Sequence, residues 1–162
     1  MERSAGILLP AFSLPGAYGI GSLGGPARRF VDFLAEAGQH YWQILPLVPP
    51  GDGSSPYMSP SAFAGNPYLI DLDELAAEGL LTPQELDGAR WPDPDRVDYD
   101  HLAQTRIPLL RKAWERSQTA HLQSDAPDLP WLEDYCTFAA LHDRYQAPFW
   151  QWPEDAPPPE PE

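Results

Sequence analysis

The sequence predicts an α/β fold built around a parallel β-sheet. Two short apolar runs, residues 5–12 and 40–48, have the length and composition of buried strands. Between them, residues 25–38 have the features of a helix, with Pro26 in the first turn and Gly38 at the end. A strand, a helix and a second strand in immediate succession form a βαβ unit, whose crossover connection makes the two strands parallel.

The chain after the second strand is predicted to be mainly helical. Residues 68–72 have the pattern of a third extended segment. Two short helices follow, and Asp73 and Thr82 are their expected N-caps. A long helix is expected over residues 106–118, with Pro108 in its first turn. Two or three strands do not complete a parallel sheet, which is covered on both faces, so the chain either forms an oligomer or is one part of a larger fold.

Composition favours a soluble protein that binds neither nucleic acid nor an anionic membrane. The 162 residues include 24 acidic and 10 basic side chains, which give a formal net charge of −14. An acidic surface repels the phosphates of nucleic acids and of anionic lipids. The single cysteine, Cys136, excludes an intrachain disulfide and favours a reducing compartment, so the cytoplasm is the expected location. No apolar run approaches the roughly 18 residues that a membrane span needs.

The segment from Gly51 to Pro67 is the first candidate site. It follows the carboxyl end of the second predicted strand, where α/β folds bind their ligands. Tyr57 lies between Pro56 and Met58 on a stiffened backbone, and its ring suits a sugar because sugar C–H groups stack on an aromatic face. Hydroxyl groups nearby could supply hydrogen bonds, from Ser54, Ser55 and Ser59. On composition alone, a surface loop whose aromatic residues merely pack it down is the simpler interpretation.

Other chemistry-bearing residues have structural interpretations. A last helix is expected over residues 131–145, and its aromatic residues share one face, which is more often a core stripe than a sugar platform. Asp71 is the most tempting carboxylate for sugar chemistry, yet a structural carboxylate before a helix is the simpler interpretation. The histidines lack metal-ligand spacing, and neither a phosphate-binding glycine loop nor a nucleophile elbow occurs. The sequence therefore predicts no metal and no cofactor.

Long motifs extend from Gly6 to about Pro153. In order, they are "GILLPAFSLPGAYGIGSLG", "FLAEAGQHYWQILPL", "SSPYMSPSAFAGNPYLIDLDEL", "RVDY" and "WLEDYCTFAALHDRY" followed by "FWQWP". In content and order they resemble the N-terminal third of the amylomaltases, which are 4-alpha-glucanotransferases of glycoside hydrolase family 77, also called disproportionating enzymes. With this resemblance, the aromatic loop is interpreted as part of a site rather than as mere packing.

The resemblance implies an incomplete (β/α)8 TIM barrel with an inserted helical subdomain. Residues 1–74 would hold the first barrel strands and the substrate loop 51–67, and residues 75–152 would form the helical insertion. Residues 153–162 would be an acidic, proline-rich tail, which is expected to be disordered.

The resemblance also implies a reaction, the transfer of α-1,4-glucan segments to glucose or maltooligosaccharide acceptors by a retaining double displacement. Tyr57 matches a tyrosine that stacks beneath the sugar at the cleavage point, and Ser55 lines the same site. Asn66 is interpreted as loop-shaping first and ligand-facing second. Ser54 stands where family members often carry an acidic or amide residue.

The family's catalytic carboxylates lie on later barrel strands, so no catalytic residue is assigned here and the chain alone is expected to be inactive and marginally folded. Its expected partners are maltooligosaccharides, glucose and α-1,4-glucans, together with the C-terminal portion of the barrel. Two alternatives stay open. One is a non-catalytic α-glucan-binding fragment, and the other is a protein-interaction piece whose proline-rich tail is the ligand.

Overall fold

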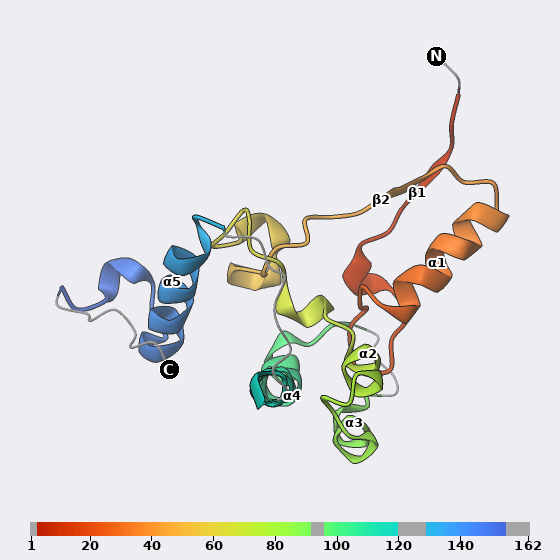
Figure 1. Ribbon diagram of the computed structural model, residues 1–162. Coiled ribbons are helices and arrows are strands. Elements are labelled where there is room, and N and C mark those ends of the chain that lie inside the picture. The colour runs from red at the N-terminus through yellow and green to blue at the C-terminus, as the bar shows by residue number, and fades with distance from the viewer. Residues whose placement is uncertain (1–2, 92–95, 120–128, 155–162) are drawn as a thin grey trace.

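The structure, a computed structural model, describes residues 3–91, 96–119 and 129–154. Its strands and main helices are, in order, β1 (Gly6–Leu8), α1 (Gly25–Glu36), β2 (Tyr41–Gln43), α2 (Leu72–Ala77), α3 (Pro83–Ala89), α4 (Tyr99–Thr119) and α5 (Leu132–Tyr145). Figure 1 shows three groups of elements: the β1–β2 pair with α1, the cluster of α2, α3 and α4, and α5 on the far side from the sheet.

β1 and β2 form the parallel pair that the βαβ pattern predicts, with Ile7 in register with Trp42. Helix α1 covers one face, because the Phe30 ring meets the Trp42 ring edge-on at a centroid distance of 5.0 Å. The prediction that both strands are buried is wrong. Leu8 is 57% exposed and Tyr41 is 65% exposed, because among the described residues the opposite face has no comparable cover.

Several helix boundaries and caps match the predictions. Gly38 and Gly79, both with positive φ, follow the ends of α1 and α2. Thr82 and Glu85 form a reciprocal capping box at the start of α3. Helix α5 begins one residue after the predicted position and ends where predicted, at Tyr145. The proline-rich tail predicted over residues 153–162 lies almost wholly outside the described residues.

Other local predictions are wrong. The expected extended segment over residues 68–72 begins as a 3-10 helix, η4 (Pro67–Leu69), and Asp71 rather than Asp73 caps α2. Helix α4 begins at Tyr99 instead of residue 106, so Pro108 lies inside the helix rather than in its first turn. Burial of Leu102 and Arg106 on the earlier turns accounts for the longer helix, because tertiary packing outweighs the local preference for ending near a proline.

The hydrophobic core lies among α2, α3 and α4. Its buried members are Tyr18, Leu72, Leu80, Leu81, Leu86, Ala89 and Ala113. Leu72 in α2 is 1% exposed, and each fully buried leucine contributes about 1.5–3 kcal/mol relative to an exposed one. Helix α5 contributes nothing comparable, because none of its residues is buried, and the prediction of a core stripe on this helix is wrong.

A buried polar group joins the start of α2 to α4. Asp71 is 6% exposed, accepts the Ser22 hydroxyl at 2.7 Å and caps α2 through the backbone N–H of Asp73. Arg106 of α4 donates from Nη2 to the carbonyl oxygen of Ile70. Burial lowers the pKa of Arg106 to about 10, and the nearby Asp71 carboxylate opposes that shift. The structural interpretation of Asp71 is therefore confirmed, since its carboxylate caps α2 and accepts the Ser22 hydroxyl.

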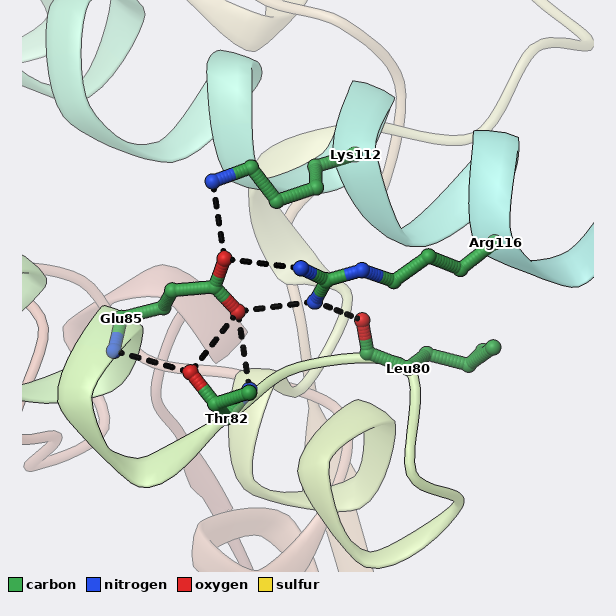
Figure 2. Close-up of polar contacts among 5 residues, drawn as sticks. All are labelled: Leu80, Thr82, Glu85, Lys112 and Arg116. Atoms are coloured by element: carbon green, nitrogen blue, oxygen red, sulfur yellow. Dashed lines mark hydrogen bonds and ion pairs between the residues drawn. The ribbon is translucent and has the colours of Figure 1, made fainter.

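Glu85 of α3 forms ion pairs with α4 at the surface of this core. Figure 2 shows its carboxylate between Lys112, at 2.8 Å, and the guanidinium of Arg116, which donates to both carboxylate oxygens. Arg116 also donates to the Leu80 carbonyl oxygen at 2.8 Å. These donors, Arg116 first and Lys112 second, hold the pKa of Glu85 well below its ordinary value. One side chain thus completes a helix cap and an interhelical ion pair.

Candidate functional site

The first half of the loop from Gly51 to Pro67 is built from two short helical turns, and residues 59–66 have no regular secondary structure. The η2 turn (Asp52–Ser54) and the η3 turn (Pro56–Met58) are separated by Ser55 alone. The Gly51 N–H donates to the Ser55 carbonyl oxygen at 3.1 Å. A side chain at Gly51 would overlap the carbonyl oxygen of Met58, so only glycine allows this close approach. The loop therefore has a defined shape at the position where it carries Tyr57.

Tyr57 lies on η3 with 71% of its surface exposed. Pro56 begins the turn, and the Ser55 hydroxyl oxygen accepts the Tyr57 backbone N–H at 3.3 Å. A proline and a serine cap fix the backbone here, because proline sets φ and the cap satisfies a free N–H. An aromatic ring that is held from its backbone and left open to solvent has a free face for a flat ligand.

The serine hydroxyls near Tyr57 are used within the loop. Ser55 caps η3, and Ser59 donates to the Ser61 carbonyl oxygen at 2.8 Å. The Ser61 hydroxyl oxygen in turn accepts the backbone N–H groups of Phe63 and Ala64. These bonds match the side-chain turns that serine forms in loops. The Ser55 hydroxyl accepts one bond here and keeps its own proton available to a ligand.

Asn66 has a position that shapes the end of the loop. It is 8% exposed, and its Oδ1 accepts the Tyr68 backbone N–H at 2.9 Å at the start of η4. Its backbone N–H donates to the carbonyl oxygen of Leu47 at 2.8 Å, which ties the loop's end to the segment after β2. The loop-shaping interpretation of Asn66 agrees with this geometry, whereas its contact with a ligand stays a prediction.

A cleft of about 300 Å³ adjoins the loop on the side of α4 and α5. Its lining residues include Gly51, Ser54, Tyr68, Tyr99, Asp100 and Tyr135. The Tyr68 and Tyr99 rings meet edge-on at a centroid distance of 5.6 Å. Burial raises the pKa of both phenols, so both remain neutral hydrogen-bonding groups near neutral pH.

The structure brings together some of the predicted site residues and separates others. Ser55 and Tyr57 share one turn, and Asn66 lies at the other end of the loop, at the start of η4. Ser54 lines the cleft, whereas Tyr57 is outside its lining. Sequence reasoning did not identify Tyr68 and Tyr99 as cleft residues. The signal available was the presence of both tyrosines inside the quoted motifs "SSPYMSPSAFAGNPYLIDLDEL" and "RVDY".

The residues that the structure describes contain no cluster of His, Cys, Asp and Glu that could hold a metal ion. Within the same three ranges, no helix is both long enough and apolar enough to cross a bilayer. The polar groups at the loop and cleft are phenols, hydroxyls, an amide and a carboxylate, which are the groups that bind the hydroxyls of a neutral carbohydrate.

Comparison with known proteins decides the family. The sequence profile of glycoside hydrolase family 77, described as 4-alpha-glucanotransferase, matches residues 9–162. The chain belongs to the 4-alpha-glucanotransferase family. Among its relatives, the 4-alpha-glucanotransferases of Synechocystis and of Thermus thermophilus are 43% and 44% identical, over 95% and 94% of this chain respectively.

The three-dimensional comparison agrees. An amylomaltase from Streptococcus agalactiae, solved in complex with acarbose, superposes with a TM-score of 0.80 at 38% identity and covers 93% of this chain. The prediction of the family from the motifs is therefore confirmed. The chain spans about a third of the length of these relatives, 32% in each of the three comparisons. A family member therefore has a further portion, about two thirds of its length, that has no counterpart here.

Proposed function

We propose that this chain forms the N-terminal, substrate-contacting part of a 4-alpha-glucanotransferase. The reaction is transfer of an α-1,4-glucan segment to glucose or to a maltooligosaccharide by retaining double displacement. Its substrates are maltooligosaccharides and α-1,4-glucans, and we place it in the cytoplasm. The observation that carries the proposal is the exposed Tyr57 ring, fixed on a serine-capped turn in a member of this family.

The proposed role of Tyr57 is to stack beneath the sugar ring at the bond that is cleaved. A rigid platform of this kind lowers the entropy that the substrate loses on reaching a reactive geometry. The Ser55 hydroxyl, which accepts the Tyr57 N–H at 3.3 Å, would hold the platform and offer its proton to a sugar oxygen. Asn66 would act through the shape of the loop, since its amide oxygen caps η4 at 2.9 Å.

The catalytic carboxylates are proposed to come from the part of a family member that this chain lacks. Double displacement needs a carboxylate nucleophile and a second carboxyl group that acts as acid and base, with the two about 5–5.5 Å apart. In the described part of this chain, Asp71 is occupied as a cap and Glu85 is occupied by Lys112 and Arg116. We therefore propose that residues 1–74 are the first part of a (β/α)8 barrel, that residues 75–152 are its helical insertion, and that the chain alone is inactive.

The test uses this chain joined to the remaining two thirds of the Streptococcus pneumoniae relative, which is 43% identical over 94% of the chain. Maltotriose disproportionation is followed by release of glucose. We expect Tyr57→Ala to lower kcat/KM by at least about 10-fold, equivalent to about 1.4 kcal/mol of transition-state stabilisation. Tyr57→Phe keeps the ring and should retain most of the activity.

Trp114→Ala is the matched control, because Trp114 is also a highly exposed aromatic residue, 57% against 71% for Tyr57, but lies on α4, away from both the loop and the strands. It is compared with Tyr57→Ala at equal folded concentration, measured by circular dichroism. Full activity in Tyr57→Ala, or an equal loss in both variants, would show that the Tyr57 ring has no specific part in transfer.

A second candidate function is α-glucan binding without catalysis. One contact favours it: the Phe63 ring of the loop stacks on Trp131, which directly precedes α5, at a centroid distance of 5.8 Å. Aromatic residues of the loop and of α5 are thus adjacent. Titration of the unmodified chain with maltoheptaose should then change its tryptophan fluorescence, and a flat response at millimolar sugar excludes this function. The proline-rich interaction proposed for residues 153–162 falls on a tail that is described only at Pro153 and Glu154.

A further inference from the structure

Arg106 is a buried cation that forms no ion pair within the described part of the chain. It is 1% exposed and lies on α4 one turn after the equally buried Leu102. Its Nη2 atom donates to the carbonyl oxygen of Ile70, whereas its Nε and Nη1 atoms have no hydrogen-bond partner among the described residues. Buried cations are normally paired or fully hydrogen-bonded, because burial removes their hydration. The guanidinium is therefore costly for stability at this position.

The bond to Ile70 joins two elements of the candidate site. Ile70 directly follows η4, and its own N–H donates to the Pro67 carbonyl oxygen at 3.2 Å. Among the described residues, the bond from Arg106 is the one hydrogen bond between α4 and residues 66–70. The edge-on contact between the Tyr68 and Tyr99 rings, at 5.6 Å, is the other link. Together these two contacts set how far η4 lies from α4.

The spacing between η4 and α4 is also the spacing between two walls of the cleft beside the loop. The lining residues from these walls are Pro67 and Tyr68 of η4 and Tyr99, Ala103 and Ile107 of α4. Asn66, which caps η4, ends the loop that carries Tyr57, so the position of η4 also sets where this loop ends. Arg106 is outside the lining of the cleft, so its influence on a ligand there is indirect.

We propose that Arg106 is a positioning residue for glucan binding, which acts by holding Ile70, and hence η4, at a fixed distance from α4. The inference rests on the proposed function for the identity of the ligand, but it concerns a buried residue that touches no sugar. Packing alone does not need a guanidinium here. An apolar side chain of similar length would fill the space without leaving two buried nitrogen atoms unpaired. The directional bond to one carbonyl oxygen is what the guanidinium adds.

Three variants of the chain separate position from packing. Arg106→Met removes the bond and keeps most of the side-chain volume. Arg106→Lys keeps a cation that can donate to the Ile70 carbonyl oxygen, and it is a fair substitute because a single nitrogen of the guanidinium is in use. Leu102→Val is the matched control, because it trims an equally buried side chain of α4 and leaves the bond in place.

The position of η4 is measured first, without sugar, by nuclear Overhauser contacts between the Tyr68 and Tyr99 rings. We expect Arg106→Met to lose these contacts, and Arg106→Lys and Leu102→Val to keep them. Maltoheptaose affinity is then measured by calorimetry. We expect Kd to rise about 10-fold in Arg106→Met and to stay within about 3-fold of wild type in the other two variants. By urea denaturation, Arg106→Met should lose no more stability than Leu102→Val, because a buried charge is removed together with the bond.

Any of four results would overturn the proposal. Arg106→Met could keep the ring contacts or the wild-type affinity, Leu102→Val could weaken binding equally, or Arg106→Lys could fail to restore binding. An unfolded Arg106→Met chain would be the fourth, because the guanidinium would then be needed for folding itself. A wild-type chain that binds no maltoheptaose would overturn the proposed function and, with it, the glucan role of Arg106. Loss of the ring contacts in Arg106→Met would still establish this residue as the one that positions η4, because that measurement needs no sugar.

Discussion

Leu72 begins helix α2 and Leu8 ends strand β1, yet Leu72 is 1% exposed and Leu8 is 57% exposed. The first, Leu72, belongs to the α2–α4 cluster. Apolar side chains, a capping box on α3 and the Glu85 ion pairs between α3 and α4 stabilise this cluster. The second belongs to the β1–β2 sheet, which α1 covers on one face. The chain thus has one region that covers its own apolar side chains and one, the β1–β2 sheet, in which apolar side chains such as Leu8 stay exposed.

The same contrast applies within the candidate site. The backbone of the Gly51–Pro67 loop is satisfied by its own serine and asparagine side chains, and yet Tyr57 is 71% exposed and Phe63 is 72% exposed. The loop therefore fixes its backbone without covering these two rings. An uncovered ring face is what the proposed carbohydrate platform needs.

The largest expected effect comes from truncation of a core side chain in the α2–α4 cluster. Leu72→Ala removes a side chain that is 1% exposed and should lower the free energy of unfolding by about 2–5 kcal/mol. Leu8→Ala, the same substitution at an exposed position of β1, should change it by less than about 0.5 kcal/mol in the chain alone. Urea denaturation followed by circular dichroism measures both. Similar losses from both variants would mean that the sheet is already covered in solution.

The next effect concerns pH and the Glu85 contacts between α3 and α4. The pKa of Glu85 is lowered by Arg116 and Lys112, so its contribution to stability is present above the ordinary glutamate pKa of 4.5 and is lost as pH falls toward the lowered value. Glu85→Gln should therefore destabilise the protein at neutral pH and have little further effect in strong acid. Urea midpoints from pH 7 down into strong acid measure this dependence.

Because these ion pairs lie at the surface, about 1 M salt should reduce the difference between wild type and Glu85→Gln at neutral pH. The control is Asp143→Asn, which removes the exposed ion pair between Asp143 of α5 and Arg111 of α4 and leaves the contacts among α2, α3 and α4 in place. A destabilisation by Asp143→Asn as large as that by Glu85→Gln would contradict the view that α2, α3 and α4 form the self-supporting part.

A smaller and local effect is expected at Gly51. Gly51→Ala would push a methyl group into the Met58 carbonyl oxygen and so displace the turn that carries Tyr57. Gly65→Ala is the control in the same loop, because a side chain there meets nothing within 4 Å. We expect Gly51→Ala to weaken maltoheptaose binding by about 10-fold and Gly65→Ala to leave it unchanged, both measured by calorimetry. Equal affinities in the two variants would show that the shape of the turn is not used in binding.

Several helix boundaries and caps could be predicted from the sequence, because interactions between neighbouring residues determine them. Pro26 and Gly38 bound α1, and Thr82 with Glu85 completes the cap of α3, so these elements depend on residues within one turn. The capped backbone of the turn that carries Tyr57 likewise depends on its neighbours Ser55 and Pro56.

The predictions that were wrong depended on contacts distant in sequence. Helix α4 extends back to Tyr99 because Arg106 reaches the Ile70 carbonyl oxygen and Leu102 is buried, and nothing near Pro108 encodes either contact. The strands looked buried because a short apolar run is typical of a buried strand, but the run alone does not determine which neighbouring elements cover it. The same reasoning explains α5, whose aromatic stripe indicated a core although none of its residues is buried here.

The proposed role of the loop can be tested on the unmodified chain by nuclear magnetic resonance. Maltoheptaose is added to about 10 mM, and the resonances of the Tyr57 ring are followed beside those of the buried Leu72 and Leu102. We predict saturable shifts of the Tyr57 ring and of the Gly51–Pro67 amides, with the two leucines unmoved and the Tyr57→Ala chain showing none. Shifts that are absent from the Tyr57 ring, or that persist unchanged in Tyr57→Ala, would contradict a glucan platform on this loop.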